Sequence, residues 1–246
     1  MSDTGCATIS LPYFHYFCRR TLSSSSFCPN LFEFHRRKPL KLRVKSMFSD
    51  TEGETLNDSA KEEPVTRRLV LLRHAKSSWK DRTLRDHDRP LSKAGRVDAM
   101  NISHKLHRMG WVPELILSSD AIRTRETLQI MQEHVQGFLE AEVRFVASFY
   151  SIAAMDGQTA EHLQEVICEI SRDEILTIMC MGHNRGWEEA ASMLSGTPIE
   201  LKTCNAALLE ASGRSWEETF HVQAFSTGLG GWRLLGVVKP DDASEG

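Results

Sequence analysis

The chain has 246 residues, of which 41% are hydrophobic and 26% are charged, and its formal net charge is −3. This length suits one sizeable domain with extensions, and the composition is ordinary for a globular protein. No apolar run approaches the roughly 20 residues that a membrane-spanning helix needs. A net negative chain also argues against nucleic acid as the main partner.

Residues 1–48 differ in composition from the rest of the chain. They contain eight basic residues, only two acids (Asp3 and Glu33) and a serine run from Ser23 to Ser26. A basic, serine-rich and acid-poor segment is typical of an organelle transit peptide. We expect import into the chloroplast, because serine and aromatic residues are plentiful and the extreme N-terminus is not basic. A mitochondrial address and a disordered basic tail are the alternatives.

The next segment, residues 49–64, contains six acids, one lysine and few apolar residues, which is typical of a disordered linker. Without residues 1–48 the formal net charge becomes −9. We expect one folded domain over residues 65–240 and a disordered tail at 241–246. The three cysteines of that domain, Cys168, Cys180 and Cys204, are isolated among apolar residues, which predicts reduced, buried thiols.

Predicted strands and helices alternate along the folded part. In chain order we predict a strand at 68–72, a helix at 92–109, a strand at 114–117, a helix at 121–135, a strand at 143–147, a helix at 159–170, a strand at 174–180, a helix at 187–194, and late strands at 206–209 and 232–238 that we expect at the edge of the sheet. Ser92 is a suitable cap for the first helix. The early strands are apolar on both faces, which predicts an α/β fold, a three-layer α/β/α sandwich around a mostly parallel sheet.

Ionisable residues follow three of these strands. Arg73 and His74 end the first strand, Arg123 lies in the stretch SSDAIRTRET after the second, and His183 lies in MGHNRG after the fourth. Ligands bind at the carboxyl ends of the strands in such sheets. Arginines bind phosphate oxygens through paired hydrogen bonds, and a neutral imidazole is a competent nucleophile. Each residue alone is weak evidence, but the ordered set predicts a phosphate site.

Five stretches carry a resemblance to a known family. LVLLRHAKSSW, DHDRPLSKAGR, LILSSDAIRTRET, FYSIAA and MGHNRGWEEAASMLSG resemble the histidine phosphatase superfamily of phosphoglycerate mutase-like proteins, and most closely its SixA-type phosphohistidine phosphatases. The resemblance implies that His74 is the nucleophile that becomes phosphorylated and that Arg73 and Arg123 hold the phosphate. It implies that His183 donates to the phosphoryl oxygens. It also implies catalysis without a metal or organic cofactor.

Some positions depart from the family pattern. Ala75 replaces the usual glycine, which is a small change. Ser77 matches the serine that the family places three residues after the histidine, whereas Lys80 replaces an asparagine. We therefore treat Ser77, Lys80 and Asn184 as candidate substrate-binding residues, with a solvent-facing Lys80 as the alternative. Arg185, in place of a proline, is expected to be an ordinary surface residue, with a contribution to the positive rim of the pocket as the alternative.

The proton donor is the least defined part of the predicted site. Mutase-like relatives carry an acidic residue on an insertion, and this chain lacks a large lid insertion. Asp81, Asp86 and Asp88 are the remaining candidates, and a structural role is the alternative for Asp86 and Asp88. A protonated phosphohistidine releases a neutral imidazole and needs little help. Without a general acid, the hydrolysis of an alkyl phosphate is slower by a factor of roughly 100 to 10,000.

The resulting hypothesis is a phosphatase for protein phosphohistidine or a small phosphomonoester. Its partners are a phosphorylated protein or a small phosphorylated metabolite, and no particular oligomeric state is predicted. The alternatives are a phosphatase for a sugar, nucleotide or lipid phosphate, and a phosphate- or phosphoprotein-binding module without turnover. Trp79, Trp187 and Trp232 are expected to serve in packing and not to form a ligand platform.

Overall fold

The computed structural model describes residues 63–227 and 231–240. The expected transit peptide, nearly all of the linker and the expected tail lie outside these residues. In the described part of the chain, none of the helices has the length and apolar character needed to cross a bilayer.

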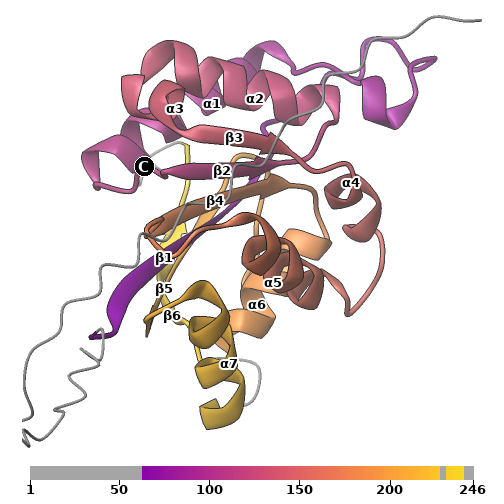
Figure 1. Ribbon diagram of the computed structural model, residues 1–246. Coiled ribbons are helices and arrows are strands. Elements are labelled where there is room, and N and C mark those ends of the chain that lie inside the picture. The colour runs from indigo at the N-terminus through magenta and orange to yellow at the C-terminus, as the bar shows by residue number, and fades with distance from the viewer. Residues whose placement is uncertain (1–62, 228–230, 241–246) are drawn as a thin grey trace, which may run out of the picture. The chain divides into compact units, whose positions relative to one another are not determined.

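A six-stranded sheet forms the centre of the fold (Figure 1). In chain order the elements are β1 (Val65–Arg73), η1 (Asp86–Asp88), α1 (Lys93–Arg108), β2 (Leu115–Ser118), α2 (Ile122–His134), α3 (Gln136–Glu140), β3 (Glu142–Phe145), α4 (Ser148–Ile152), α5 (Thr159–Ile170), β4 (Thr177–Gly182), α6 (Gly186–Ser195), β5 (Ala206–Gly213), α7 (Trp216–Thr227) and β6 (Arg233–Val238). The spatial order is β3-β2-β4-β1-β5-β6. The first four strands of this order are parallel, β5 is antiparallel to β1, and β6 is antiparallel to β5.

Helices cover both faces of the sheet, which confirms the predicted α/β/α sandwich (Figure 1). Val70 and Leu72 of β1 belong to the core that α1, α2 and α3 cover, whereas Leu69 and Leu71 belong to the core beneath α5, α6 and α7. All four side chains are fully buried. A strand that is buried on both faces reads as a continuous apolar run, and this is the pattern that identified β1 from the sequence.

Most predicted elements are present within a few residues of their expected ends. The hydroxyl of Ser92 accepts a hydrogen bond from the Gly95 amide, so the predicted cap of α1 is confirmed. Strand β4 begins at Thr177, three residues later than predicted, because Ile175 N donates back to Arg172 O in a turn. The sequence analysis missed α7, which buries Trp216 and Phe220 against Trp232.

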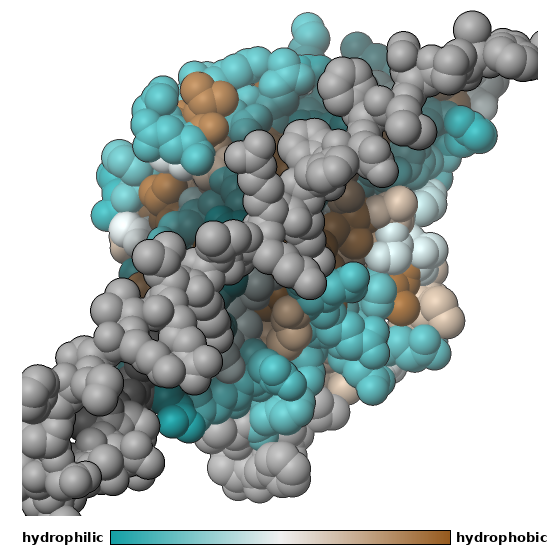
Figure 2. All heavy atoms as spheres, viewed as in Figure 1, coloured by the Kyte–Doolittle hydropathy of each residue, from teal (hydrophilic) through white to brown (hydrophobic). Residues whose placement is uncertain are grey.

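The outer surfaces of the helices are mainly polar. On the face seen in Figure 2, hydrophilic residues predominate and apolar residues appear in separate small areas. Cys180 and Cys204 are buried and Cys168 is half-buried, and all three are free thiols. The prediction of buried thiols is therefore confirmed for two of the three.

The strand order brings the predicted site residues to one edge of the sheet. Because β4 lies between β2 and β1, the carboxyl ends of all three strands are adjacent. Backbone hydrogen bonds fix their alignment: His74 N donates to Gly182 O at 3.0 Å, and Ser119 N donates to Met181 O at 2.9 Å. The residues that follow these three strands must therefore share one site.

Candidate active site

Arg123, from the first turn of α2, lies between the two histidines. Its Nε donates to Nε2 of His74 and its Nη2 donates to Nδ1 of His183, each at 3.1 Å. The two imidazole rings have their centroids 5.1 Å apart. All three residues are buried. The structure thus brings together two histidines and an arginine that the sequence placed on three separate segments.

His74 is held in one neutral form. Its Nδ1 donates to the Ala75 carbonyl at 2.7 Å, and its Nε2 accepts from Arg123, so the lone pair is on Nε2. The pKa of His74 is lowered to about 3, chiefly by burial and also by the cations Arg123 and Arg73, against the opposing effect of the Ala75 hydrogen bond. A neutral imidazole with a fixed lone pair is suited to attack a phosphorus atom.

His183 takes the opposite tautomer. Its Nδ1 accepts from Arg123, which leaves the proton on Nε2 to be donated to the Ser119 hydroxyl at 2.8 Å. Burial, with His74 and Arg123 close by, lowers the pKa of His183 to about 2. In this arrangement the single N–H of His183 is already used by Ser119. The donation to phosphoryl oxygens that the resemblance implies therefore requires a second proton on this ring.

Arg73 contributes charge to the site from the end of β1. Its Nη1 donates to the Leu201 carbonyl at 2.8 Å, while its buried Nε has no hydrogen-bond partner in the described part of the chain. A buried guanidinium N–H without a partner is uncommon and is the sort of donor that a bound anion would satisfy.

Asp86 and Tyr150 border Arg123 on the side away from His74. Oδ2 of Asp86 accepts from Arg123 Nη2 at 2.8 Å and from the Tyr150 hydroxyl at 3.1 Å. The Tyr150 ring meets His183 edge to face, with centroids 5.3 Å apart. Tyr150 was not predicted as a site residue, although it lies in FYSIAA, one of the stretches that carry the family resemblance.

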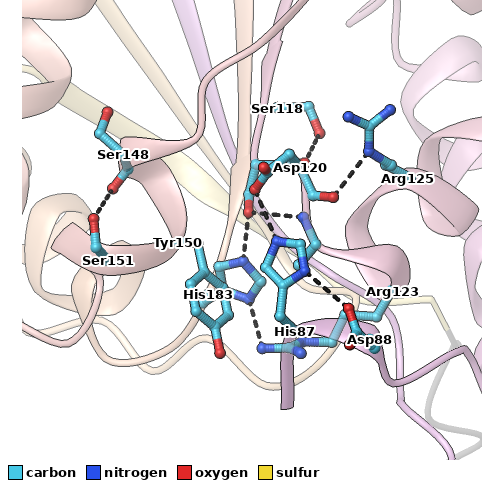
Figure 3. A network of polar contacts seen from close by, with 12 residues as sticks. His87, Asp88, Ser118, Asp120, Arg123, Arg125, Ser148, Tyr150, Ser151 and His183 are labelled. Atoms are coloured by element: carbon cyan, nitrogen blue, oxygen red, sulfur yellow. Dashed lines mark hydrogen bonds and ion pairs between the residues drawn. The ribbon is translucent and has the colours of Figure 1, made fainter. Parts of the chain in front are cut away.

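The side chain of His87, in η1, contacts Asp120, which lies just before α2. His87 Nε2 lies 3.1 Å from Asp120 Oδ1 and His87 Nδ1 lies 3.3 Å from Asp88 Oδ1. Dashed lines mark both contacts in Figure 3. The hydrogen bond to Asp120 makes the largest contribution to raising the pKa of His87, against a smaller effect of burial. A histidine that pairs with two carboxylates is stabilised as the cation. The sequence analysis also missed this residue and Ser119.

The three candidate proton donors occupy different surroundings. Asp81 is exposed and accepts from the amide and hydroxyl of Thr83, which lowers its pKa. Asp88 accepts from Arg85 and lies beside His87, and its pKa is also lowered. Only Asp86 contacts the central arginine. Burial raises the pKa of Asp86, but Arg123, Tyr150 and Arg89 lower it by more. All three carboxyl groups are therefore ionised near neutral pH.

The remaining candidates differ in burial. Ser77 is half-buried and its backbone pairs with Leu91, whereas Lys80 and Asn184 are exposed. An exposed Lys80 agrees with the alternative that this residue faces solvent. The expectation for Arg185 is confirmed, since its exposed side chain lies 3.9 Å from Asp156.

The three predicted packing tryptophans differ in burial. Trp187 and Trp232 are buried as expected, but Trp79 is 63% exposed. The guanidinium of the buried Arg89 lies 4.0 Å from the centroid of the Trp79 ring. Trp79 lies in the loop between β1 and η1 and is itself a member of neither core.

Comparison with known proteins identifies the family. Residues 69–166 match the model of the histidine phosphatase superfamily, branch 1. A chloroplastic protein of Arabidopsis thaliana, itself uncharacterized, is 65% identical over 179 residues, which cover 73% of this chain and 80% of that protein. The chain belongs to the histidine phosphatase superfamily. The predicted family is thereby confirmed.

Solved structures place this histidine phosphatase beside SixA proteins. A protein from Agrobacterium tumefaciens, assigned as the phosphohistidine phosphatase SixA, is 26% identical with a TM-score of 0.54, over 71% of this chain and 98% of its own. A SixA-assigned protein from Nakamurella multipartita is 21% identical with a TM-score of 0.57, over 74% and 100%, and supports the fold alone. Family and neighbours together support phosphatase activity on phosphorylated substrates.

Proposed function

We propose that this protein is a metal-independent phosphatase that works through a phosphohistidine intermediate on His74, with protein phosphohistidine as its preferred substrate. One observation carries the proposal: Arg123 donates to an unprotonated Nε2 of His74 and to His183 at the same distance. An arginine at this position can bind a phosphoryl group that enters between the histidines, because its N–H groups already point into that space.

The reaction has two steps. Nε2 of His74 attacks phosphorus, the bond from phosphorus to the leaving nitrogen breaks, and the substrate histidine departs as a neutral imidazole because it entered protonated. Water then attacks the phosphorus on His74, the N–P bond breaks, and both protons of the water leave with inorganic phosphate. The Ala75 carbonyl favours this second step, since it keeps Nδ1 of His74 protonated and lets His74 also depart as a neutral imidazole.

His183 changes its protonation when substrate binds. A phosphoryl dianion raises the pKa of a neighbouring imidazole, so His183 takes up a proton from solvent at Nδ1 and donates a hydrogen bond through it to a phosphoryl oxygen. Nε2 remains bonded to Ser119, which keeps the ring in place. His183 can therefore act as the hydrogen-bond donor that the family resemblance implies, because the negative charge of the phosphoryl group stabilises the second proton on its ring.

The ionised carboxylates favour a phosphoramidate over an alkyl ester. Asp81, Asp86 and Asp88 all have lowered pKa values, so none of them carries a proton to give at neutral pH. A leaving imidazole tolerates this absence, whereas an alkoxide does not. A small phosphomonoester with a good leaving group is the second candidate substrate.

The test compares substrates on the full chain. Hydrolysis of a phosphohistidine peptide, p-nitrophenyl phosphate and 3-phosphoglycerate is measured without added metal, with the His74→Ala variant as the blank. We expect fast turnover of the phosphohistidine peptide that depends on His74. Preference for 3-phosphoglycerate would contradict the substrate assignment. Absence of all turnover with vanadate still bound would instead favour the binding-module alternative.

The proposed location is the chloroplast, with residues 1–48 as the transit peptide. The basic, serine-rich composition of this segment and the chloroplastic relative from Arabidopsis thaliana support this proposal. Fusion of residues 1–64 to a fluorescent protein tests it, and mitochondrial fluorescence would contradict it.

A further inference from the structure

The guanidinium of Arg123 has two edges with different partners. The edge formed by Nε and Nη2 faces His74 and His183. On the other edge, Nη1 donates to the backbone carbonyl of Asp86, and the second N–H of Nη2 donates to the Asp86 carboxylate at 2.8 Å. One residue therefore holds the distal edge of the arginine through two separate acceptors.

Asp86 is itself held in position. Besides Arg123, its carboxylate accepts from the Tyr150 hydroxyl at 3.1 Å and lies 3.6 Å from Arg89 Nε. The contact of His87 with Asp120 connects η1, which carries Asp86, to the segment between β2 and α2. The Asp86 side chain is 55% exposed, whereas that of Arg123 is 7% exposed. Asp86 thus lies at the outer side of the site and Arg123 lies between it and the histidines.

We propose that Asp86 is a positioning residue, which acts by fixing the orientation in which Arg123 presents its Nε–Nη2 edge to the phosphoryl group. A long arginine side chain loses rotamer freedom when it binds an anion, and a fixed distal edge means that much of this loss has already occurred. The ionised carboxylate of Asp86 accepts a hydrogen bond from Arg123 on the side of the guanidinium opposite His74. This role replaces the proton-donor role considered from the sequence.

The assignment rests on the proposed function for its catalytic consequences, but vanadate binding tests it separately. We would measure the vanadate affinity of the full chain and of the variants Asp86→Ala and Asp86→Asn. Asp81→Ala is the matched control, because Asp81 is an exposed carboxylate in the loop that precedes η1 and it contacts Thr83. Hydrogen bonds to charged groups are worth enough for an affinity loss of about 10- to 100-fold in Asp86→Ala. Asp86→Asn retains an acceptor oxygen and should recover part of the loss.

A second measurement separates positioning from proton donation. The kcat/KM of each variant is compared across aryl phosphates whose leaving groups differ in basicity. A positioning residue acts on the phosphoryl group, so the loss should be the same factor for every leaving group. A proton donor would give a loss that increases with the basicity of the leaving group.

Each outcome decides the assignment. Unchanged vanadate affinity in both Asp86 variants, or a loss that depends on the leaving group, would overturn it. If Asp86→Ala fails to fold, the near-isosteric Asp86→Asn provides the same comparison. If the wild-type chain binds vanadate but turns over no substrate, the proposed function fails while the vanadate comparison still decides the role of Asp86. A wild-type chain that binds no vanadate would overturn both.

Discussion

Arg123 Nε donates a hydrogen bond to His74 Nε2 at 3.1 Å. The acceptor is the nitrogen lone pair that we propose as the nucleophile. This contact keeps Nε2 unprotonated and holds the ring in one orientation. Substrate must displace it, because the same N–H is needed by a phosphoryl oxygen. The contact therefore protects the reactive nitrogen from protonation until an anion takes its place.

Replacement of Arg123 tests whether its fork of N–H groups is needed. We expect Arg123→Lys to lower vanadate affinity by about 10- to 100-fold, since a lysine supplies charge without the paired geometry. Isothermal titration with vanadate measures the change. Arg125→Ala is the control on the same helix, because Arg125 is exposed and donates to the Asp120 carbonyl. Equal affinities of wild type and Arg123→Lys would remove Arg123 from the phosphate site.

The two buried histidines predict loss of stability in acid. Burial lowers the pKa of His74 to about 3 and that of His183 to about 2, well below the ordinary value near 6.5. Between about pH 6.5 and pH 3 the unfolded chain binds protons at these positions and the folded chain does not, so the free energy of unfolding falls as pH falls. Urea unfolding at a series of pH values measures this slope. The His183→Asn variant should show a smaller slope of unfolding free energy against pH. An unchanged slope would contradict the lowered pKa of His183.

His87 predicts the opposite pH dependence. Its carboxylate partners, Asp120 and Asp88, raise its pKa in the folded state. The stability it contributes is fully present below its ordinary pKa and is lost as pH rises through the raised value. His87→Gln should therefore be less stable than wild type at pH 6 and nearly equal to it at pH 9. Thermal unfolding at both values decides the matter, and a constant difference would show that the charge of His87 is unimportant.

Trp187 and Trp79 differ strongly in burial, so we expect their replacement to cause different losses of stability. Trp187 is fully buried, donates to the Cys180 carbonyl at 2.9 Å and packs edge to face on Phe149. Trp187→Ala should lower the free energy of unfolding by about 3–5 kcal/mol. Trp79→Ala should lower it by less than about 1 kcal/mol, because the Trp79 side chain is mainly exposed. Urea unfolding of both variants measures the difference, and similar losses would contradict the assigned burial.

The sequence by itself determined the class of fold and the central residues of the site. Val70 and Leu72 alternate with Leu69 and Leu71 in a run with no polar interruption, and such a run is typical of a strand buried on both faces. Because parallel strands end at a common edge, the residues after β1, β2 and β4 could be assigned to one site before any distance was known.

The tertiary structure alone decided which neighbours complete the site and in what state they are. Tyr150 lies 64 residues from Asp86 in the chain, yet its hydroxyl donates to the same carboxylate oxygen as Arg123. The tautomers of His74 and His183 depend on the Ala75 carbonyl and the Ser119 hydroxyl, which no spacing rule specifies. The difference in burial between Trp187 and Trp79 also became known only from the tertiary structure. Local pattern fixes which residues face a core or follow a strand, whereas hydrogen-bond partners and protonation depend on distances that exist only after the strands have paired.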